Sequence, residues 1–161
     1  MATKYTCTFY SQNVDSSGNE QKWKIDIDSA SYGGASTEFN CTSEGFTLNM
    51  NGGSDSMLAP IKTTSVDFNM ILENATLEGI IDDLQAVATG NESDFSVAIY
   101  NYYSGAFRLH WVGYLLGDLV TLDDTAINRV INIKATDGIN KLKYMPIDHS
   151  SYNGSRSILN L

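Results

Sequence analysis

The residues best suited to chemistry in this 161-residue sequence are few and scattered. Histidine and cysteine are the usual ligands of zinc, yet His110, His149, Cys7 and Cys41 have no metal-ligand spacing among them. His110 lies inside an expected strand beside Trp111, where a lone histidine is more often packed or solvated than a ligand. The sequence therefore predicts no metal site.

A pair of acids, Asp26 and Asp28, shares one face of an expected strand, as a general acid and base would. Alternating acids on a solvated strand face are much commoner, so we interpret the pair as solvent-facing. The segments "NGGSDS" and "DLVTLDD" lack the residue order of a calcium loop, and the sequence has no P-loop and no G-x-S-x-G. We therefore predict a protein that is not an enzyme and has no cofactor.

Aromatic residues are frequent in "IYNYY" and "LHWVGY" and could stack on sugar rings. A place in the core or at an interface is the preferred interpretation. A β-sandwich module that binds carbohydrate or protein is the alternative function.

The alternation of apolar and polar residues, together with 13 glycines, predicts a mainly β fold with one helix. The first two strands should form a hairpin, Ser104-Gly105 should turn a second hairpin, and residues 117–126 should form an acidic loop. The expected strands are 4–13, 22–28, 44–53, 60–72, 94–103, 107–116 and 127–136.

The expected helix covers about residues 75–88, with Asn74 as its N-cap and Gly90 just beyond its end. Its apolar residues recur at three and four positions and should pack on the sheet. They are Leu77, Ile80, Ile81, Leu84 and Val87.

The strand at 107–116 is apolar on both faces, which predicts cover on both faces. In a chain of this size, the second cover could be a neighbouring subunit. One face carries Phe107, Leu109, Trp111 and Leu115, and the other carries Val112, Tyr114 and Leu116.

The net charge of −9 disfavours a protein that grips a phosphate backbone. Residues 64–106 contain seven acids and no Lys or Arg, whereas five bases face two acids after Thr125. Solvated faces would explain this asymmetry, and so would head-to-tail contact between copies of the chain. The predicted subunit interface contains Glu78, Asp82, Asp83, Tyr114, Leu116, Arg129 and Lys134.

The segment "MATKYTCTFY" has no apolar signal core, and no apolar run reaches the length of a membrane span. Two cysteines cannot form a disulfide framework, and Cys7 alternates with aromatic residues like a small buried side chain. We therefore expect both thiols to be reduced, in a protein made in cytoplasm without a membrane span.

The order of several segments resembles the N-terminal region of tail hub (baseplate hub) proteins of tailed bacteriophages. In order, they are "WKIDI", "YGGAST", "APIKTTSVDFNM", an acidic helix, "LHWVGYLL", an acidic loop and "VINIKATDGINKLKYMPID". The resemblance covers most of residues 20–147, although hub proteins are usually much longer.

The resemblance implies a barrel-like antiparallel β domain with a packed external helix, over residues 1–147, followed by a polar tail at 148–161. It implies a structural protein of the virion tail, made in the host cytoplasm, that forms a homo-oligomeric ring and contacts other tail proteins. DNA would pass through the ring without specific binding, and like charge would keep DNA off the wall. Asp137-Gly138 would end the last strand, with Gly138 free to take a positive φ.

Overall fold

A computed structural model describes residues 1–14, 18, 20–51, 63–89, 94–117, 121–123 and 129–139. The fold is mainly β with one helix, as predicted. Its elements are β1 (Ala2–Val14), β2 (Glu20–Ser29), β3 (Thr37–Glu38), β4 (Asn40–Asn51), β5 (Thr63–Leu72), α1 (Ala75–Thr89), β6 (Phe95–Tyr103), β7 (Ala106–Leu115), β8 (Thr121–Asp123) and β9 (Arg129–Thr136). The predicted boundary at residue 147 and the polar tail lie outside the described residues.

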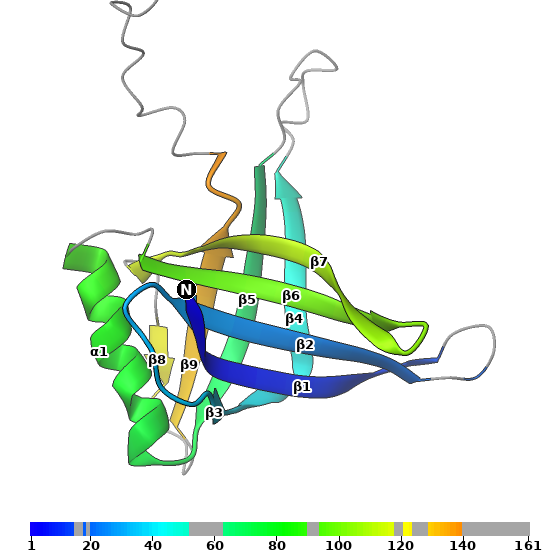
Figure 1. The fold of residues 1–161 in the computed structure, drawn as a ribbon, viewed down its shortest axis with the longest axis horizontal. Coiled ribbons are helices and arrows are strands. Elements are labelled where there is room, and N and C mark those ends of the chain that lie inside the picture. Colours follow the sequence, from blue (N-terminus) through cyan, green and yellow to red (C-terminus); the bar gives the residue numbers. More distant parts are fainter. Residues whose placement is uncertain are drawn as a thin grey trace, which may run out of the picture.

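The strands form one sheet in the order β3-β1-β2-β6-β7-β9-β5-β4, and β8 pairs with β9. Strands β1, β2, β6 and β7 form a first layer, and β9, β5 and β4 cross it steeply (Figure 1). The hydrogen-bonded order is open at β3 and β4, so the expected barrel is not confirmed. These two end strands are consecutive in the chain, separated only by Phe39.

The core lies between the two layers, and the alternation of buried side chains is clearest in β5, where Val66, Phe68, Met70 and Leu72 are buried. Both hairpins are present, and Ser104 (φ 54°) and Gly105 (φ 85°) form the two-residue turn expected between β6 and β7. Core residues exposed by 2% or less include Ile25, Ile27, Val66, Phe68, Met70, Val97, Ile99, Ile131 and Ile133.

The predicted helix is confirmed at one end of the two layers (Figure 1). The Asn74 side-chain oxygen accepts a hydrogen bond from the Leu77 N–H at 3.0 Å, which is the expected N-cap contact. Of the apolar stripe, Ile81 is half-buried, and the other four residues are at most 2% exposed. The helix is therefore held by its apolar face.

A hydrogen-bonded corner joins β7 to β9 and β5. The Trp111 indole N–H donates to the Thr64 hydroxyl at 2.8 Å, while Asp137 accepts from the Thr64 N–H at 2.6 Å and from its hydroxyl at 2.8 Å. Gly113 lies in the same corner, where a Cβ would come within 2.4 Å of the Thr136 carbonyl oxygen. Gly138 adopts φ 77°, as predicted for the end of the last strand.

Two details of the prediction were wrong. A β-bulge lies between the pairs Ile99–Trp111 and Tyr100–Leu109, so Leu109 faces away from the core that holds Trp111. One extra residue reverses the alternation on one side of the bulge, and sequence periodicity does not reveal it. The expected loop also contains strand β8, which pairs with β9.

We predict that Leu84→Ala lowers the free energy of unfolding by roughly 2–5 kcal/mol, because it removes a buried side chain between the helix and the sheet. Denaturant unfolding measures this change. Asp82→Ala, on the exposed side of the same helix, should change stability by about 0.5 kcal/mol or less. Equal effects of the two variants would contradict the packing described for the helix.

Candidate functional site

The strand register orders the side chains on the side of the first layer that faces away from the core, here called the outer face. In one row, Thr8, Lys24, Tyr100 and Leu109 lie side by side on β1, β2, β6 and β7. The next row contains Thr6, Asp26, Ala98 and Val112. Most of the exposed aromatic and apolar side chains of this layer therefore gather on one surface.

Two lysines cover aromatic rings on the outer face. The Lys24 ammonium lies 4.5 Å from the centre of the Tyr100 ring, and the Lys22 ammonium lies 5.4 Å from Tyr10 and 5.7 Å from Tyr102. Cations at such distances are attracted to the ring face. The rings are therefore partly covered by the chain's own cations, which reduces the aromatic surface left for a sugar on this face.

Asp26 is not solvent-facing, which corrects the interpretation made from the sequence. It is only 4% exposed, accepts a hydrogen bond from the Thr6 hydroxyl at 2.6 Å and pairs with Lys24 at 2.5 Å. A buried carboxylate needs such partners to offset its lost hydration. Because both oxygens are engaged, Asp26 serves the structure of the outer face.

Strand β7 forms the apolar border of the outer face. Leu109 is 58% exposed and Val112 is 51% exposed. Among the described residues, β7 pairs with β9 only at Tyr114 and Leu115, so its backbone edge before Gly113 is open on that side. An exposed strand with an open edge and apolar side chains has the features of surfaces that associate with other chains.

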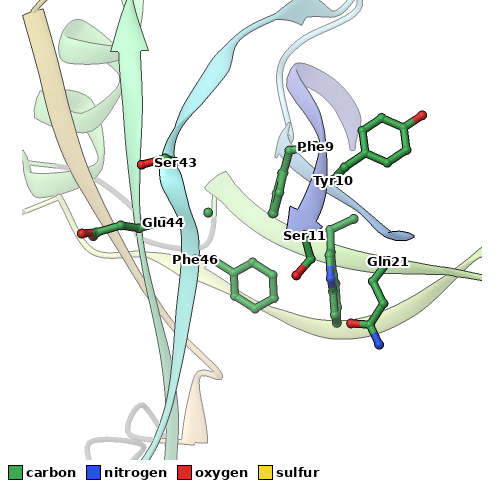
Figure 2. Close-up of a pocket in the computed structure, with 9 residues that line it drawn as sticks. Phe9, Tyr10, Ser11, Gln21, Ser43, Glu44 and Phe46 are labelled. Atoms are coloured by element: carbon green, nitrogen blue, oxygen red, sulfur yellow. The ribbon is translucent and has the colours of Figure 1, made fainter. Parts of the chain in front are cut away.

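Between β1 and β4 the structure forms a cleft of about 400 Å³. Figure 2 shows Phe9 and Phe46 pointing into the gap, whereas Tyr10 and Glu44 point away from it. Trp23 also lines the cleft, with its ring centre 5.1 Å from that of Phe46. The cleft therefore has an aromatic wall, with neutral side chains such as Ser11 and Gln21 on its border.

A bulge in β4 positions Phe46 at this cleft. The pairing with β5 shifts between Cys41 and Phe46, and Gly45 adopts φ 65° within the shift. A Cβ at Gly45 would lie 2.8 Å from the Phe9 ring. Glycine is therefore required here by both backbone conformation and contact.

Two of the three acidic residues of the predicted interface have partners within the same chain. Glu78 pairs with Arg129 at 2.9 Å, and Asp83 pairs with Lys4 at 2.6 Å. Asp83 also accepts a hydrogen bond from Tyr5 at 2.9 Å, and burial followed by the charge of Asp83 raises the pKa of Tyr5. The Glu78–Arg129 contact, expected between subunits, is thus present within one chain.

The rest of the predicted interface is divided between exposed and half-buried positions. Asp82 is exposed, and Lys134 lies 3.9 Å from Asp67. Tyr114 and Leu116 are half-buried; the Tyr114 ring packs beside Gly138, and the Leu116 N–H donates to the Lys134 carbonyl. Contact of these residues with a second subunit stays a prediction.

Sequence reasoning placed Val112 on the same face as Tyr114 and Leu116, but it placed Leu109 on the opposite face with Trp111. The sequence shows that both residues are apolar. It does not show the bulge that brings Leu109 to the same face as Val112.

The described residues contain no cluster of three or more His, Cys, Asp or Glu side chains that could hold a metal ion. His110 instead packs edge to face with Trp23, with 5.2 Å between ring centres. His149 lies outside the described residues. No helix in the described ranges is long and apolar enough to cross a membrane.

No family model, curated protein or solved structure matches this chain at a significant level. Function is therefore argued from the outer face and the cleft.

We predict that Gly45→Ala costs about 1–3 kcal/mol of stability, because alanine is strained at this φ and its methyl group meets Phe9. Thermal and denaturant unfolding would measure the loss. Gly33→Ala is the matched control, since nothing lies within 4 Å of its added Cβ and its φ is not positive. Gly33→Ala should be neutral or slightly stabilising, and a Gly45→Ala variant as stable as this control would contradict the argument.

Proposed function

We propose that this protein is a non-enzymatic structural subunit that self-assembles into a ring, as a tail hub or baseplate hub component of a phage virion. The observation that carries the proposal is the exposure of Leu109 and Val112 beside the open edge of β7. Association would cover these side chains and could add backbone hydrogen bonds along the edge. The hub assignment and the closed, barrel-like form of the domain rest on the sequence resemblance.

The physical case for assembly is that β7 holds its apolar residues on a rigid support. Phe107, Leu109, Val112 and Tyr114 follow one another along the outer face, and β6 pairs with β7 along nearly its whole length. A preformed surface on paired strands associates without the entropy loss of ordering a loop. The bulge interrupts the edge, so side-chain burial would contribute more than continuous strand pairing.

The charge of the chain suits the proposed channel. A net charge of −9 would keep passing DNA from adhering to the wall of a ring. Exposed acids such as Asp82 would set the orientation of neighbouring copies more than their affinity. Other tail proteins would contact the ring, which would be assembled in the host cytoplasm and carried in the virion tail.

We predict that Val112→Asp abolishes assembly and leaves the monomer folded, because it puts an unpaired charge in the proposed contact. Sedimentation velocity and electron microscopy would follow the loss of rings. Thr8→Asp places the same charge on an exposed position of the outer face, on β1, and should still assemble. A wild-type protein that stays monomeric at high concentration would refute the proposed function.

A carbohydrate-binding module is the second candidate, and the cleft between β1 and β4 is the observation that favours it. Its volume suits a small ligand, and aromatic walls with neutral polar neighbours suit the apolar face and hydroxyl groups of a sugar. No residue of β7 lines the cleft, so separate substitutions can test the two candidates.

For the second candidate, we predict that a neutral oligosaccharide that binds will lose at least tenfold in affinity on Phe46→Ala, because a wall of the cleft is removed. Calorimetry of a panel of neutral oligosaccharides measures this change. Tyr102→Ala, which removes an exposed outer-face ring, is the control and should leave binding unchanged. Absence of binding across the panel would contradict this candidate.

A further inference from the structure

Cys7 on β1 and Cys41 on β4 lie near the place where β3 ends and β4 begins, which are the two ends of the strand order. Strand β3 pairs with β1 at Tyr5 and Thr6, and the Phe39 N–H donates to the Thr6 carbonyl at 2.9 Å. Immediately beyond, β4 turns away to pair with β5, beginning with Asn40 and Cys41. Cys7 and Cys41 therefore flank the point at which β1 and β4 part.

Contacts on both sides of the pair hold it in place. On one side, the hydrogen bond from the Phe39 N–H to the Thr6 carbonyl joins the residue before Cys7 to the residue two positions before Cys41. Cys7 belongs to the core cluster, and Cys41 packs against it. Two residues further along β1, the ring centre of Phe9 lies 6.2 Å from that of Phe46 on β4.

We propose that Cys7 and Cys41 are a dithiol site that forms an intramolecular disulfide when the protein meets a small disulfide oxidant. The bond would tie β1 to β4 two residues along β1 from Phe9, which lines the aromatic cleft. This inference is independent of the proposed function. It differs from the sequence expectation of two separate reduced thiols, because 34 positions separate the cysteines in the chain and only the fold brings them together.

The reaction balances as two thiol–disulfide exchanges. Cys41, the more accessible thiol, attacks the oxidant and releases one reduced thiol, forming a mixed disulfide. The Cys7 thiolate then attacks the Cys41 sulfur, forms the Cys7–Cys41 bond and expels the second thiolate. Overall, two protein thiols lose two electrons and two protons, and the oxidant is reduced to two thiols.

The environments of the two sulfurs affect the two steps differently. The hydrogen bond with Cys7, followed by burial, raises the pKa of Cys41, so the first attack on the oxidant is slow. Cys7 is 2% exposed, so a bulky oxidant reaches Cys41 first. The hydrogen bond from the Cys41 side chain lowers the pKa of Cys7 against the opposing effect of burial, and the Cys41 N–H contributes further. The thiolate is the attacking species, so this favours Cys7 as the group that resolves the mixed disulfide.

In the experiment, the native full chain is incubated with oxidised glutathione. Its tryptic peptides are then mapped under non-reducing conditions, so that any disulfide stays intact. Trypsin places the cysteines on different peptides, 5–22 and 25–62, because lysines flank both segments. The expected product is a joined pair of these peptides from a chain that has lost two hydrogen atoms. Closure of a loop of this length should raise the melting temperature by roughly 5–15 °C, and dithiothreitol should reverse the rise.

Single variants distinguish the steps. Cys7→Ser should stop at a stable mixed disulfide with glutathione on Cys41, whereas Cys41→Ser should leave the buried Cys7 unmodified. Wild-type protein that stops at the mixed disulfide, links two chains, or forms the internal bond only in guanidinium would overturn the proposal. Oxidation to the internal bond in native buffer, with both variants behaving as described, would support it.

Discussion

Trp111 and Asp137 both hydrogen-bond to Thr64, and this shared contact fixes the corner where the two layers of the sheet join. Only a short stretch of β7 pairs with β9, so few ladder hydrogen bonds connect the layers there. The side-chain contacts add to that connection, and Gly113 permits the backbone of β7 to approach Thr136. The relative angle of the layers, and with it the shape of the core and cleft, depends on this corner.

Acidic residues of α1 connect the helix to both layers. Asp83 contacts Lys4 and Tyr5 of β1, and Glu78 contacts Arg129 of β9. The apolar face of the helix accounts for its burial, but apolar contacts alone do not fix its rotation or its position along the layers. The ion pairs at two different strands supply that orientation, which gives the acidity of the helix a structural role within a single chain.

The elements that rest on local patterns were predictable from the sequence. The Asn74 cap, the apolar stripe of α1, both hairpins and the positive φ of Gly138 each depend on residues close together in the chain. The outward position of Leu109 depends on a bulge, and the burial of Asp26 depends on Thr6 from a neighbouring strand. Likewise, the aromatic cleft and the meeting of the cysteines require β1 and β4 to lie together, which periodicity does not encode.

The continuity of β3 and β4 has a kinetic consequence. The continuous segment of β3 and β4 pairs with β1 through β3 and with β5 through β4. Strand β2 also pairs with β6, and β5 also pairs with β9, both of which come later in the chain. Most of these partners are distant in sequence, so their loops must close before pairing gives any stabilisation. During synthesis, the first hairpin can form early, but the second layer is incomplete until β9 has left the ribosome. Folding of the whole sheet is therefore coupled to completion of nearly the entire described chain.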